Sequence, residues 1–230
     1  MTIAENIARI RANMAAAARE AGRDPKEILL VGASKMNDAA ACREAVAAGI
    51  DALGENRVQE MVQKLEQHAY DGAPLHFIGH LQRNKVKQVV GHVALIQSVG
   101  SLELLDEIEK VAAARGLVQD ILLEVNIGRE AAKSGFAPEK VLPAAEAALE
   151  RTHVRVRGLM TIPPADAQRD ANFRYFQEVQ ALYVDMNQKL FHNELEYLSM
   201  GMSGDDEDAI RAGATMVRVG SAIFGARHYN

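Results

Sequence analysis

The chain is poor in cysteine, with Cys42 as its single example among 230 residues. One cysteine excludes intramolecular disulfide bonds and metal sites built from several thiolates, and it favours a reducing cytoplasm. Cys42 itself falls within a helical pattern, where we expect a small buried apolar group.

Long apolar runs and a strong excess of one charge are also missing. No apolar stretch approaches the roughly 20 residues of a membrane-spanning helix, and the charged start of the chain lacks the apolar segment of a signal peptide. The formal net charge is −5, which provides no general surface for nucleic acid or anionic membranes. We therefore expect a cytoplasmic protein that has neither a nucleic-acid partner nor a membrane partner.

The sequence does contain a regular alternation of short β-rich runs and amphipathic helices. Several of the runs are almost continuously apolar, which is typical of strands that are covered on both faces in a parallel sheet. The expected strands are 28–33, 50–54, 75–79, 94–99, 120–126, 154–159, 195–200 and 215–220.

The helices between these runs have recognisable ends and faces. The clearest helix uses Ser101 as its amino-terminal cap and Gly116 as its left-handed terminus. A helix over 38–48 repeats this scheme. A longer helix over about 170–190 carries one broad apolar face, and residues 3–21 form an extra helix before the first strand.

Eight strands, each followed by a helix or a helical turn, predict a single (β/α)8 barrel of the α/β class over residues 1–230. The extra helix precedes this barrel at the amino terminus. A doubly wound open sheet is the alternative. Against it, the first expected strand is not followed by G-x-G-x-x-G, and the chain has no Walker motif.

A lysine stands where the first expected strand ends, in the sequence VGASK. In (β/α)8 barrels the chemistry is placed at the carboxyl ends of the strands. Lys35 is therefore either a solvated loop lysine or a Schiff-base lysine. In the second case low-dielectric walls lower the pKa of its ammonium, and the free amine attacks a carbonyl.

The loops after the seventh and eighth strands both carry glycine and serine. Phosphate sites of this fold form in these loops, together with the amino terminus of a short extra helix. Glycine allows close backbone approach, helix-start N–H groups point at an anion, and hydroxyl groups add donors. The pattern favours a phosphate site at Ser203, Gly220 and Ser221. The alternative is two turns that need glycine only for their geometry.

Arg218 lies two residues before Gly220, so both residues share one face of the last strand. An arginine inside the mouth of a barrel needs a partner, because a buried unpaired charge is costly. We expect that partner to be either a strand-end carboxylate, such as Glu55 or Glu124, or an acceptor on a ligand.

A carbonyl near Lys35 and a phosphate near Ser203 and Ser221 together describe a phosphorylated aldehyde or ketone. Pyridoxal 5′-phosphate satisfies both requirements. A sugar phosphate in a lysine aldolase satisfies them as well, so the residues alone leave the two ligands open.

Seven stretches make the chain similar to a known family, the pyridoxal phosphate homeostasis proteins. They span residues 31 to 227 in the order found in that family. The resemblance implies a single barrel like the N-terminal domain of alanine racemase, with pyridoxal 5′-phosphate held as a Schiff base. The stretches are VGASK, LGENRVQE, HFIGHLQRNKVK, SVGSLELL, LEVNIGREAAKSGF, RGLMTIPP and LSMGMSGDDEDAIRAGATMVRVGSAIFGAR.

By that resemblance, Lys35 is the residue that binds pyridoxal 5′-phosphate covalently. The resemblance also implies that Ser203 and the backbone at Gly220 and Ser221 hold the phosphate, and that Arg218 faces the pyridine nitrogen. Two further residues are expected to line the cofactor, namely Asn56 and Met200.

The resemblance leaves catalysis open. An arginine at the ring nitrogen disfavours its protonation and so weakens the ring as an electron sink. The similar alanine racemase has a second domain with an opposing tyrosine base, which we expect to be missing here. We therefore expect a carrier that supplies pyridoxal 5′-phosphate without strong turnover. An amino-acid racemase with Tyr70 or His80 as its base is the alternative, and a lysine aldolase is the third.

The expected partners of such a carrier are pyridoxal 5′-phosphate itself, amino acids and apoenzymes that require the cofactor. We expect a monomer, with a weak dimer as the alternative. His76 and His80 have the spacing of a zinc pair but fall on a strand and its loop, so we expect no metal. The basic stretch 83–87 is expected to be a solvated face or to bind an anion, and Lys133 and Ser134 likewise form either an anion site or an exposed loop.

Overall fold

The computed structural model describes residues 1–164 and 168–225, and it confirms the (β/α)8 barrel. Its strands are all parallel and follow one another around the barrel in chain order, so that β8 pairs with β1 and closes the sheet. This closure excludes the doubly wound open sheet. The strands are β1 (Leu29–Ala33), β2 (Ala52–Glu55), β3 (Leu75–Phe77), β4 (Leu95–Val99), β5 (Gln119–Val125), β6 (Val154–Thr161), β7 (Tyr197–Met202) and β8 (Met216–Val219).

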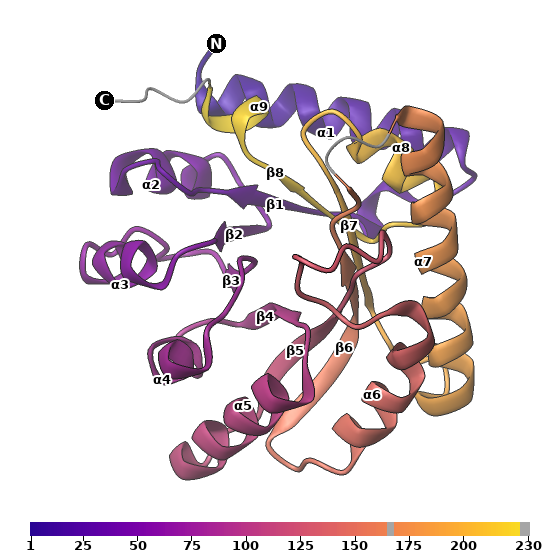
Figure 1. The fold of residues 1–230 in the computed structure, drawn as a ribbon. Helices are drawn as coiled ribbons and strands as arrows, with labels where there is room; N and C mark the ends of the chain where they lie inside the picture. The colour runs from indigo at the N-terminus through magenta and orange to yellow at the C-terminus, as the bar shows by residue number, and fades with distance from the viewer. Residues whose placement is uncertain (165–167, 226–230) are drawn as a thin grey trace.

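Helices surround the strands on the outside of the barrel, as Figure 1 shows. The expected helices over 3–21, 38–48 and 170–190 are present as α1, α2 and α7. Short 3-10 turns occur at Pro25–Glu27, Arg83–Lys85 and Pro138–Lys140. The α-helices are α1 (Ile3–Glu20), α2 (Ala39–Ala47), α3 (Val58–Glu66), α4 (Val86–Val89), α5 (Leu102–Arg115), α6 (Val141–Leu149), α7 (Arg169–Leu190), α8 (Asp206–Arg211) and α9 (Ser221–Phe224).

The ends of α5 follow the signals read from the sequence. The Ser101 hydroxyl accepts a hydrogen bond from the backbone N–H of Leu104, and Gly116 adopts the left-handed conformation with φ +63°. Asp38 caps the start of α2 in the same way as Ser101 caps α5. In the described parts of the chain, no helix combines the length and the apolar character that crossing a membrane requires.

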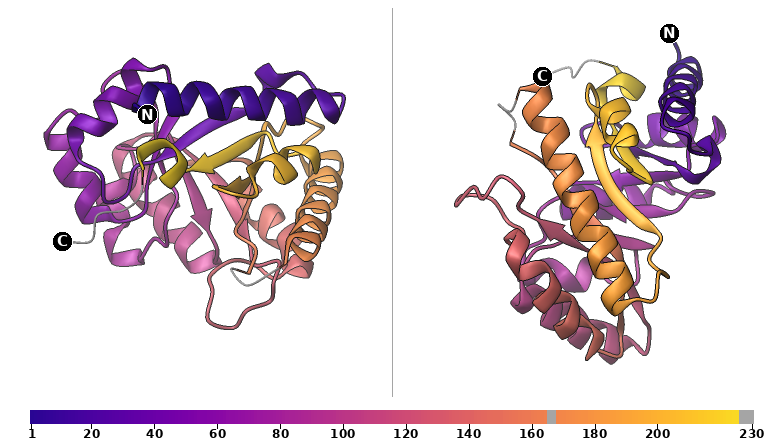
Figure 2. Two further views of the ribbon diagram at one scale, coloured as in Figure 1. Left: turned by 90° about the horizontal axis from the view of Figure 1, so that it is seen from above. Right: turned by 90° about the vertical axis from the view of Figure 1, so that its right-hand side faces the viewer.

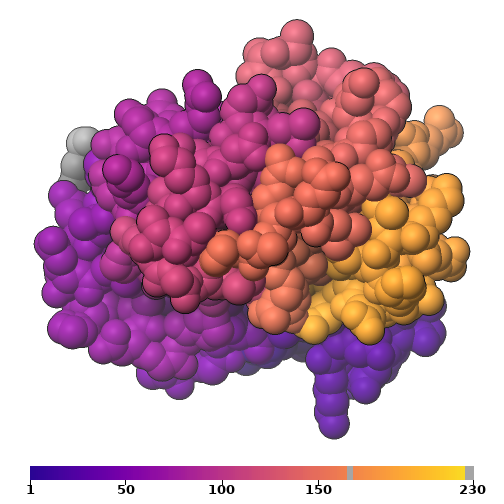
Figure 3. All heavy atoms as spheres, turned by 90° about the horizontal axis from the view of Figure 1, so that it is seen from below, coloured from indigo at the N-terminus to yellow at the C-terminus, as the bar shows by residue number. Residues whose placement is uncertain are grey.

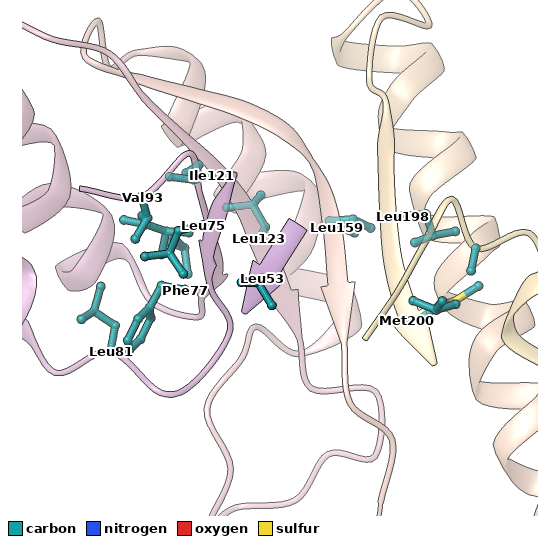
Figure 4. Packing of buried hydrophobic residues seen from close by; sticks show 14 of the residues in the cluster. Leu53, Leu75, Phe77, Leu81, Val93, Ile121, Leu123, Leu159, Leu198 and Met200 are labelled. Carbon is teal, nitrogen blue, oxygen red and sulfur yellow. The ribbon is translucent and has the colours of Figure 1, made fainter. Parts of the chain in front are cut away.

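The apolar core consists of two layers that the barrel wall separates. Alternate residues of each strand face outward to the helices and inward to the barrel axis. The outer layer contains Leu53, Phe77, Leu123 and Leu159, which Figure 4 shows, and it also contains the fully buried Cys42. The smaller inner layer consists of Val31, Ala52, Leu95, Leu122, Met160 and Met216.

The extra helix α1 packs against α8 and α9, so the start of the chain lies beside its last described segment. Figures 1 and 2 show this arrangement in different views. Figure 3 shows the molecule from below, where indigo residues from the start of the chain lie next to amber residues that precede its yellow end. The buried Asn6 side chain donates a hydrogen bond of 2.9 Å to the carbonyl of Ile223 in α9. The added helix therefore fixes the segment that follows β8.

Gly158 provides a test of the register between β6 and β7. This residue pairs with Tyr197 and has φ +152°, and a Cβ atom placed on it would lie 1.7 Å from the Tyr197 carbonyl oxygen. Because that oxygen belongs to the backbone of a paired strand, it cannot move aside. We expect Gly158→Ala to lower the free energy of unfolding by at least about 3 kcal/mol, measured by urea denaturation.

The matched control is Gly116→Ala, which also places alanine at positive φ but meets no atom within 4 Å. It should lose only about 1 kcal/mol. Equal losses in the two variants would contradict the close approach of β6 and β7.

Candidate functional site

The carboxyl end of β1 leads into a tight turn that contains Lys35. The strand ends at Ala33, Ser34 is buried, and Lys35 itself is partly exposed. Met36 follows with φ +63°, a left-handed conformation that few residues other than glycine adopt. The backbone N–H of Asn37 donates to the Ser34 carbonyl at 3.1 Å and closes the turn. Lys35 therefore lies at the mouth of the barrel, at the end where this fold places its chemistry.

A buried network of charged groups lies against this turn. One carboxylate oxygen of Glu55, at the end of β2, accepts hydrogen bonds from the Ser34 hydroxyl (2.6 Å), the Lys64 ammonium (2.6 Å) and the Tyr70 hydroxyl (3.0 Å). Lys64 also donates to the Ser34 carbonyl (2.8 Å) and to Glu60 (2.7 Å). Burial lowers the pKa of Lys64, but the charge of Glu55 and the two carboxylate hydrogen bonds outweigh it and raise the pKa.

Tyr70, which the sequence offered as a base for a racemase, belongs to this network. Its side chain is 5% exposed and its hydroxyl points at Glu55. Burial and the charge of Glu55 raise the pKa of Tyr70 far above its ordinary value, so the phenol stays protonated. Such a group is a poor base, and we assign it to the structural network.

The loops after β7 and β8 meet beside the Lys35 turn. The backbone N–H of Gly220 donates to the Ser203 hydroxyl at 3.3 Å. Helix α9 begins directly after Gly220, with Ser221 exposed as its first residue. A Cβ atom on Gly220 would lie 3.2 Å from the carbonyl oxygen of Ala33 in β1, so glycine allows the two strand ends to lie close together. We call Ser203, Gly220 and Ser221 the hydroxyl–amide cradle.

Arg218 is buried inside the barrel, with 3% of its surface exposed. Its guanidinium donates to the Ser199 hydroxyl at 2.6 Å and to the Thr161 carbonyl at 2.9 Å. Burial lowers the pKa of Arg218 to about 10, and the charges of nearby carboxylates oppose that change. Within residues 1–164 and 168–225 no carboxylate forms an ion pair with Arg218, so the pairing expected with Glu55 or Glu124 is not formed.

A chain of hydrogen bonds continues from Arg218 across the barrel interior. The Ser199 hydroxyl donates to the side-chain carbonyl of Gln97 at 2.6 Å, and the Gln97 amide nitrogen lies 3.0 Å from Nδ1 of His76. Because that amide nitrogen only donates, Nδ1 of His76 accepts and the ring proton lies on Nε2. Burial lowers the pKa of His76 to about 4. At neutral pH, Arg218 is therefore the one charged side chain in this series of hydrogen-bonded residues.

A cavity of about 410 Å³ opens at the mouth, where the ends of β2, β3, β5 and β6 meet. Asn56 lines it, and the side-chain oxygen of Asn56 is buried without a hydrogen-bond partner among the described residues. A buried carbonyl oxygen ordinarily accepts a hydrogen bond, so Asn56 provides an unsatisfied acceptor in the wall of this cavity. The other residues that line it are Ile78, Gly79, His80, Glu124, Val125, Asn126, Ala132, Lys133, Ser134 and Ile162.

Glu124, which the sequence offered only as an alternative partner of Arg218, is a titratable side chain in this cavity. Burial raises the pKa of its carboxyl, while a 3.0 Å hydrogen bond from the Ser134 hydroxyl and the charges of His80 and Arg218 act against that change. Ser134 therefore folds the loop after β5 back onto the mouth, and Lys133 in the same loop forms an ion pair with Glu130.

The structure places the side chain of Met200, one of the residues expected to line a cofactor, away from the cavity. The side chain is fully buried in the outer apolar layer, together with Leu198 (Figure 4). Because successive strand residues point to opposite faces, the inward-facing residue of β7 is its neighbour Ser199, which contacts Arg218.

Four residues that form contacts in the site were not predicted from the sequence, although the sequence contained a signal for two of them. Gln97 and Ser199 are polar residues inside otherwise apolar strand runs, and such residues must find buried partners. Lys64 and Thr161 gave no such signal, because their roles depend on residues that are distant in the sequence.

The chain matches known proteins over nearly its whole length. A family described as the alanine racemase N-terminal domain matches residues 6–228. The pyridoxal phosphate homeostasis proteins of Pseudomonas aeruginosa and Aquifex aeolicus are both 42% identical, with 99% and 100% of this chain and 97% and 100% of those proteins covered.

Solved structures show the same likeness. PipY of Synechococcus elongatus, solved with pyridoxal phosphate bound, is 31% identical with a TM-score of 0.85 over 97% of this chain and 100% of that one. An alanine racemase of Clostridium difficile is 18% identical with a TM-score of 0.71, over 88% of this chain and 53% of the racemase, which is a likeness of fold.

The closed barrel, with its site residues at the carboxyl ends of the strands, defines a protein of the alanine racemase N-terminal-domain class. Within this class, the sequence identity that the chain shares with its relatives along its full length identifies one family. The chain belongs to the family of pyridoxal phosphate homeostasis proteins.

The buried His76 makes the stability of the barrel depend on pH. The unfolded chain binds a proton near the ordinary pKa of 6.5, whereas the folded chain does so only at about 4. Between these values the unfolded state holds more protons, so stability falls as the pH drops through this window, by on the order of 3 kcal/mol. His76→Asn keeps an acceptor for Gln97 and removes the titration, so this pH-dependent loss should disappear.

Urea unfolding at pH 7 and pH 4.5 measures the difference. The control is His92→Asn, which changes an exposed histidine and should retain the full loss. The same pH dependence in all three proteins would contradict the assignment of His76.

Proposed function

We propose that the protein binds pyridoxal 5′-phosphate at the mouth of the barrel as a Schiff base on Lys35, and that it stores and supplies this cofactor in the cytoplasm. The observation that carries this proposal is the meeting of the hydroxyl–amide cradle with the Lys35 turn. The Gly220 backbone, whose N–H donates to the Ser203 hydroxyl, lies against Ala33, two residues before Lys35. Donors for an anion and a reactive amine thus share one rim.

The residues present fit the chemical groups of this cofactor. The cradle offers a hydroxyl group and the backbone N–H groups at the start of α9, which suit a phosphate. Arg218 is a buried cation without a carboxylate in ion-pair contact among the described residues, and it suits the acceptor nitrogen of a pyridine ring. Asn56 has an unmet side-chain oxygen in the cavity wall. Met200 joins this set only through its backbone, because its side chain faces the outer layer.

The chemistry that the bound cofactor supplies is an aldehyde that joins the Lys35 amine as a C=N bond with loss of water, attached to a ring that withdraws electrons. The chain's own residues limit that withdrawal. Arg218 is held in its position by Ser199 and Thr161, and its positive charge opposes a second positive charge on the ring nitrogen. This arrangement favours holding the cofactor over using it for turnover.

The names of the relatives support a role in supply. Proteins of this family carry homeostasis in their names, and the PipY structure contains the cofactor. We propose that the recipients are amino acids, which take the cofactor from Lys35 through their own amines, and apoenzymes that require it. We further propose that the protein acts as a monomer.

Replacement of Lys35 tests the covalent linkage. Purified protein loaded with pyridoxal 5′-phosphate should lose its visible absorbance band on borohydride reduction, and peptide mapping should then find the pyridoxyl mark on Lys35. Lys35→Ala should show neither the band nor the mark. Lys26→Ala is the control, because Lys26 is an exposed lysine that precedes β1 at the opposite end of the barrel. A mark on any other lysine in the wild-type protein would overturn the proposal.

The same proteins decide between a carrier and a racemase. We expect the loaded wild-type protein to racemise alanine and serine far below ordinary enzyme rates of about 1–10³ per second. Turnover within that range that disappears in Lys35→Ala would instead establish the racemase.

Removal of the Ser203 hydroxyl tests the cradle. A hydrogen bond to a charged group contributes about 1.5–3 kcal/mol, which corresponds to a ten- to hundredfold change in affinity. Ser203→Ala should therefore weaken binding of pyridoxal 5′-phosphate by about that factor, as measured by titration of the visible band. Binding of pyridoxal, which has the aldehyde but no phosphate, should stay within about twofold of the wild type. An equal effect on both ligands would place the phosphate elsewhere.

A further inference from the structure

We propose that Lys64 is a positioning residue that holds the backbone on both sides of Lys35 and so fixes where the Lys35 amine lies. The inference rests on the proposed function only in its consequence for cofactor binding. The geometry itself concerns groups of this chain alone, all of them in the described residues.

The three protons of the Lys64 ammonium match its three hydrogen bonds. Two of its acceptors are the Ser34 carbonyl at 2.8 Å and Glu60 at 2.7 Å. The Ser34 carbonyl is the peptide group immediately before Lys35. The same oxygen of Glu60 accepts the backbone N–H of Met36 at 2.5 Å, which is the peptide group immediately after Lys35. Lys64 thus holds one side of Lys35 directly and the other side through Glu60.

We call the hydrogen bonds of Lys64 and Glu60 to the two peptide groups beside Lys35 the clamp. The third acceptor of Lys64 connects the clamp to the barrel wall. Lys64 donates at 2.6 Å to Glu55, which is fully buried at the end of β2 and also accepts the Ser34 hydroxyl at 2.6 Å. Ser34 is therefore held at its side chain by Glu55 and at its carbonyl by Lys64. The position of the turn is set by β2 and α3, two elements that do not contain Lys35.

The conformation of Met36 explains why such a clamp is needed. Its φ of +63° lies in the left-handed region, which is unfavourable for a residue with a side chain. The Met36 side chain is 51% exposed, so packing of that side chain does not compensate. The hydrogen bond from the Met36 N–H to Glu60 stabilises this conformation. Without it, the turn is free to relax to an ordinary conformation, and the direction of the Lys35 side chain changes with it.

The choice of a charged residue at this position also requires a reason. The Lys64 side chain is 6% exposed, and burying an ion pair is often no better for stability than a well-packed apolar residue of similar volume. Methionine at position 64 would fill the same space between α3 and the strands. It would not bind the Ser34 carbonyl or orient Glu60. The turn is therefore the feature that depends on an ammonium group rather than on packing.

Tyr70 separates this role from general support of the network. Its hydroxyl bonds to the same oxygen of Glu55 at 3.0 Å, but none of its hydrogen bonds involves residues 34 to 36. Tyr70→Phe weakens the network and leaves the clamp in place, so it is the matched control.

The test compares four proteins: the wild type, the double variant Lys64→Met with Glu55→Gln, the single variant Glu60→Ala, and the single variant Tyr70→Phe. The double variant removes both buried charges together, so that no unpaired ion remains. Glu60→Ala removes the oxygen that accepts the Met36 N–H. Because the Glu60 side chain is 20% exposed, this variant keeps the assay decisive if the double variant does not fold. Each protein is measured for its urea unfolding, for the affinity of pyridoxal 5′-phosphate, and for the rate at which trinitrobenzenesulfonate labels Lys35 in the cofactor-free protein.

Misplacement of a reacting group by about 1 Å can cost about a hundredfold in function. We expect the double variant and Glu60→Ala to bind the cofactor at least about tenfold more weakly and to shift the labelling rate of Lys35 by a similar factor. Tyr70→Phe should unfold at lower urea while both Lys35 measurements stay within about twofold of wild type. Unchanged labelling and affinity in both folded clamp variants would overturn the role of Lys64.

The labelling experiment keeps this inference separate from the proposed function. If borohydride marks no lysine in the wild-type protein, the proposed function fails, but labelling of the cofactor-free protein still reports the position of Lys35. If the mark is on Lys35 and the clamp variants behave as wild type, only the inference about Lys64 fails.

Discussion

The pairing of β8 with β1 is the interaction on which the site depends. Val31 of β1 is in register with Arg218 of β8, and this contact joins the two ends of the sheet into a closed ring. Closure places the carboxyl ends of β1, β7 and β8 side by side, so that Gly220 lies against Ala33 although almost the whole chain separates them. Helix α1 reinforces the arrangement through Asn6, which holds α9. Lys35 and the hydroxyl–amide cradle share one rim because the barrel is closed.

The second constraint is that polar groups buried near this rim need hydrogen-bond partners. Two networks on opposite faces of the wall provide them, although one oxygen of Glu55 and one of Asn56 have no partner among the described residues. Outside, Lys64 and Glu55 bond to the turn that contains Lys35; inside, Arg218 is held by Ser199 and Thr161. The outer network combines charges of both signs, whereas the inner chain joins a single cation to neutral groups. A guanidinium held in this way keeps its charge available for a ligand, which agrees with a role in holding a pyridine ring.

The same networks bear on the choice between carrier and catalyst. Catalysis by a cofactor of this kind needs a base facing the substrate and a ring that accepts electrons. The Tyr70 hydroxyl donates a hydrogen bond to Glu55 in the outer network. In the proposed complex, the charge of Arg218 opposes protonation of the pyridine nitrogen. At the mouth, His80 and Glu124 line the cavity, but Glu124 already accepts a hydrogen bond from Ser134. These contacts support the proposed role of retaining a cofactor over that of turning over a substrate.

The sequence by itself determined the local features of this protein. Apolar runs predicted the strands, Ser101 and Gly116 marked the ends of α5, and the strand end before Lys35 together with the glycines and serines after β7 and β8 predicted the rim of the site. These signals are local because periodicity, capping and turn chemistry act over a few residues. Only the tertiary structure decided which partner each buried group takes. Glu55 binds Lys64 instead of Arg218, and Met200 faces the helices while Ser199 faces the barrel. The physical reason is that such choices depend on the alternation of each strand and on closure of the ring, which bring together residues far apart in the chain.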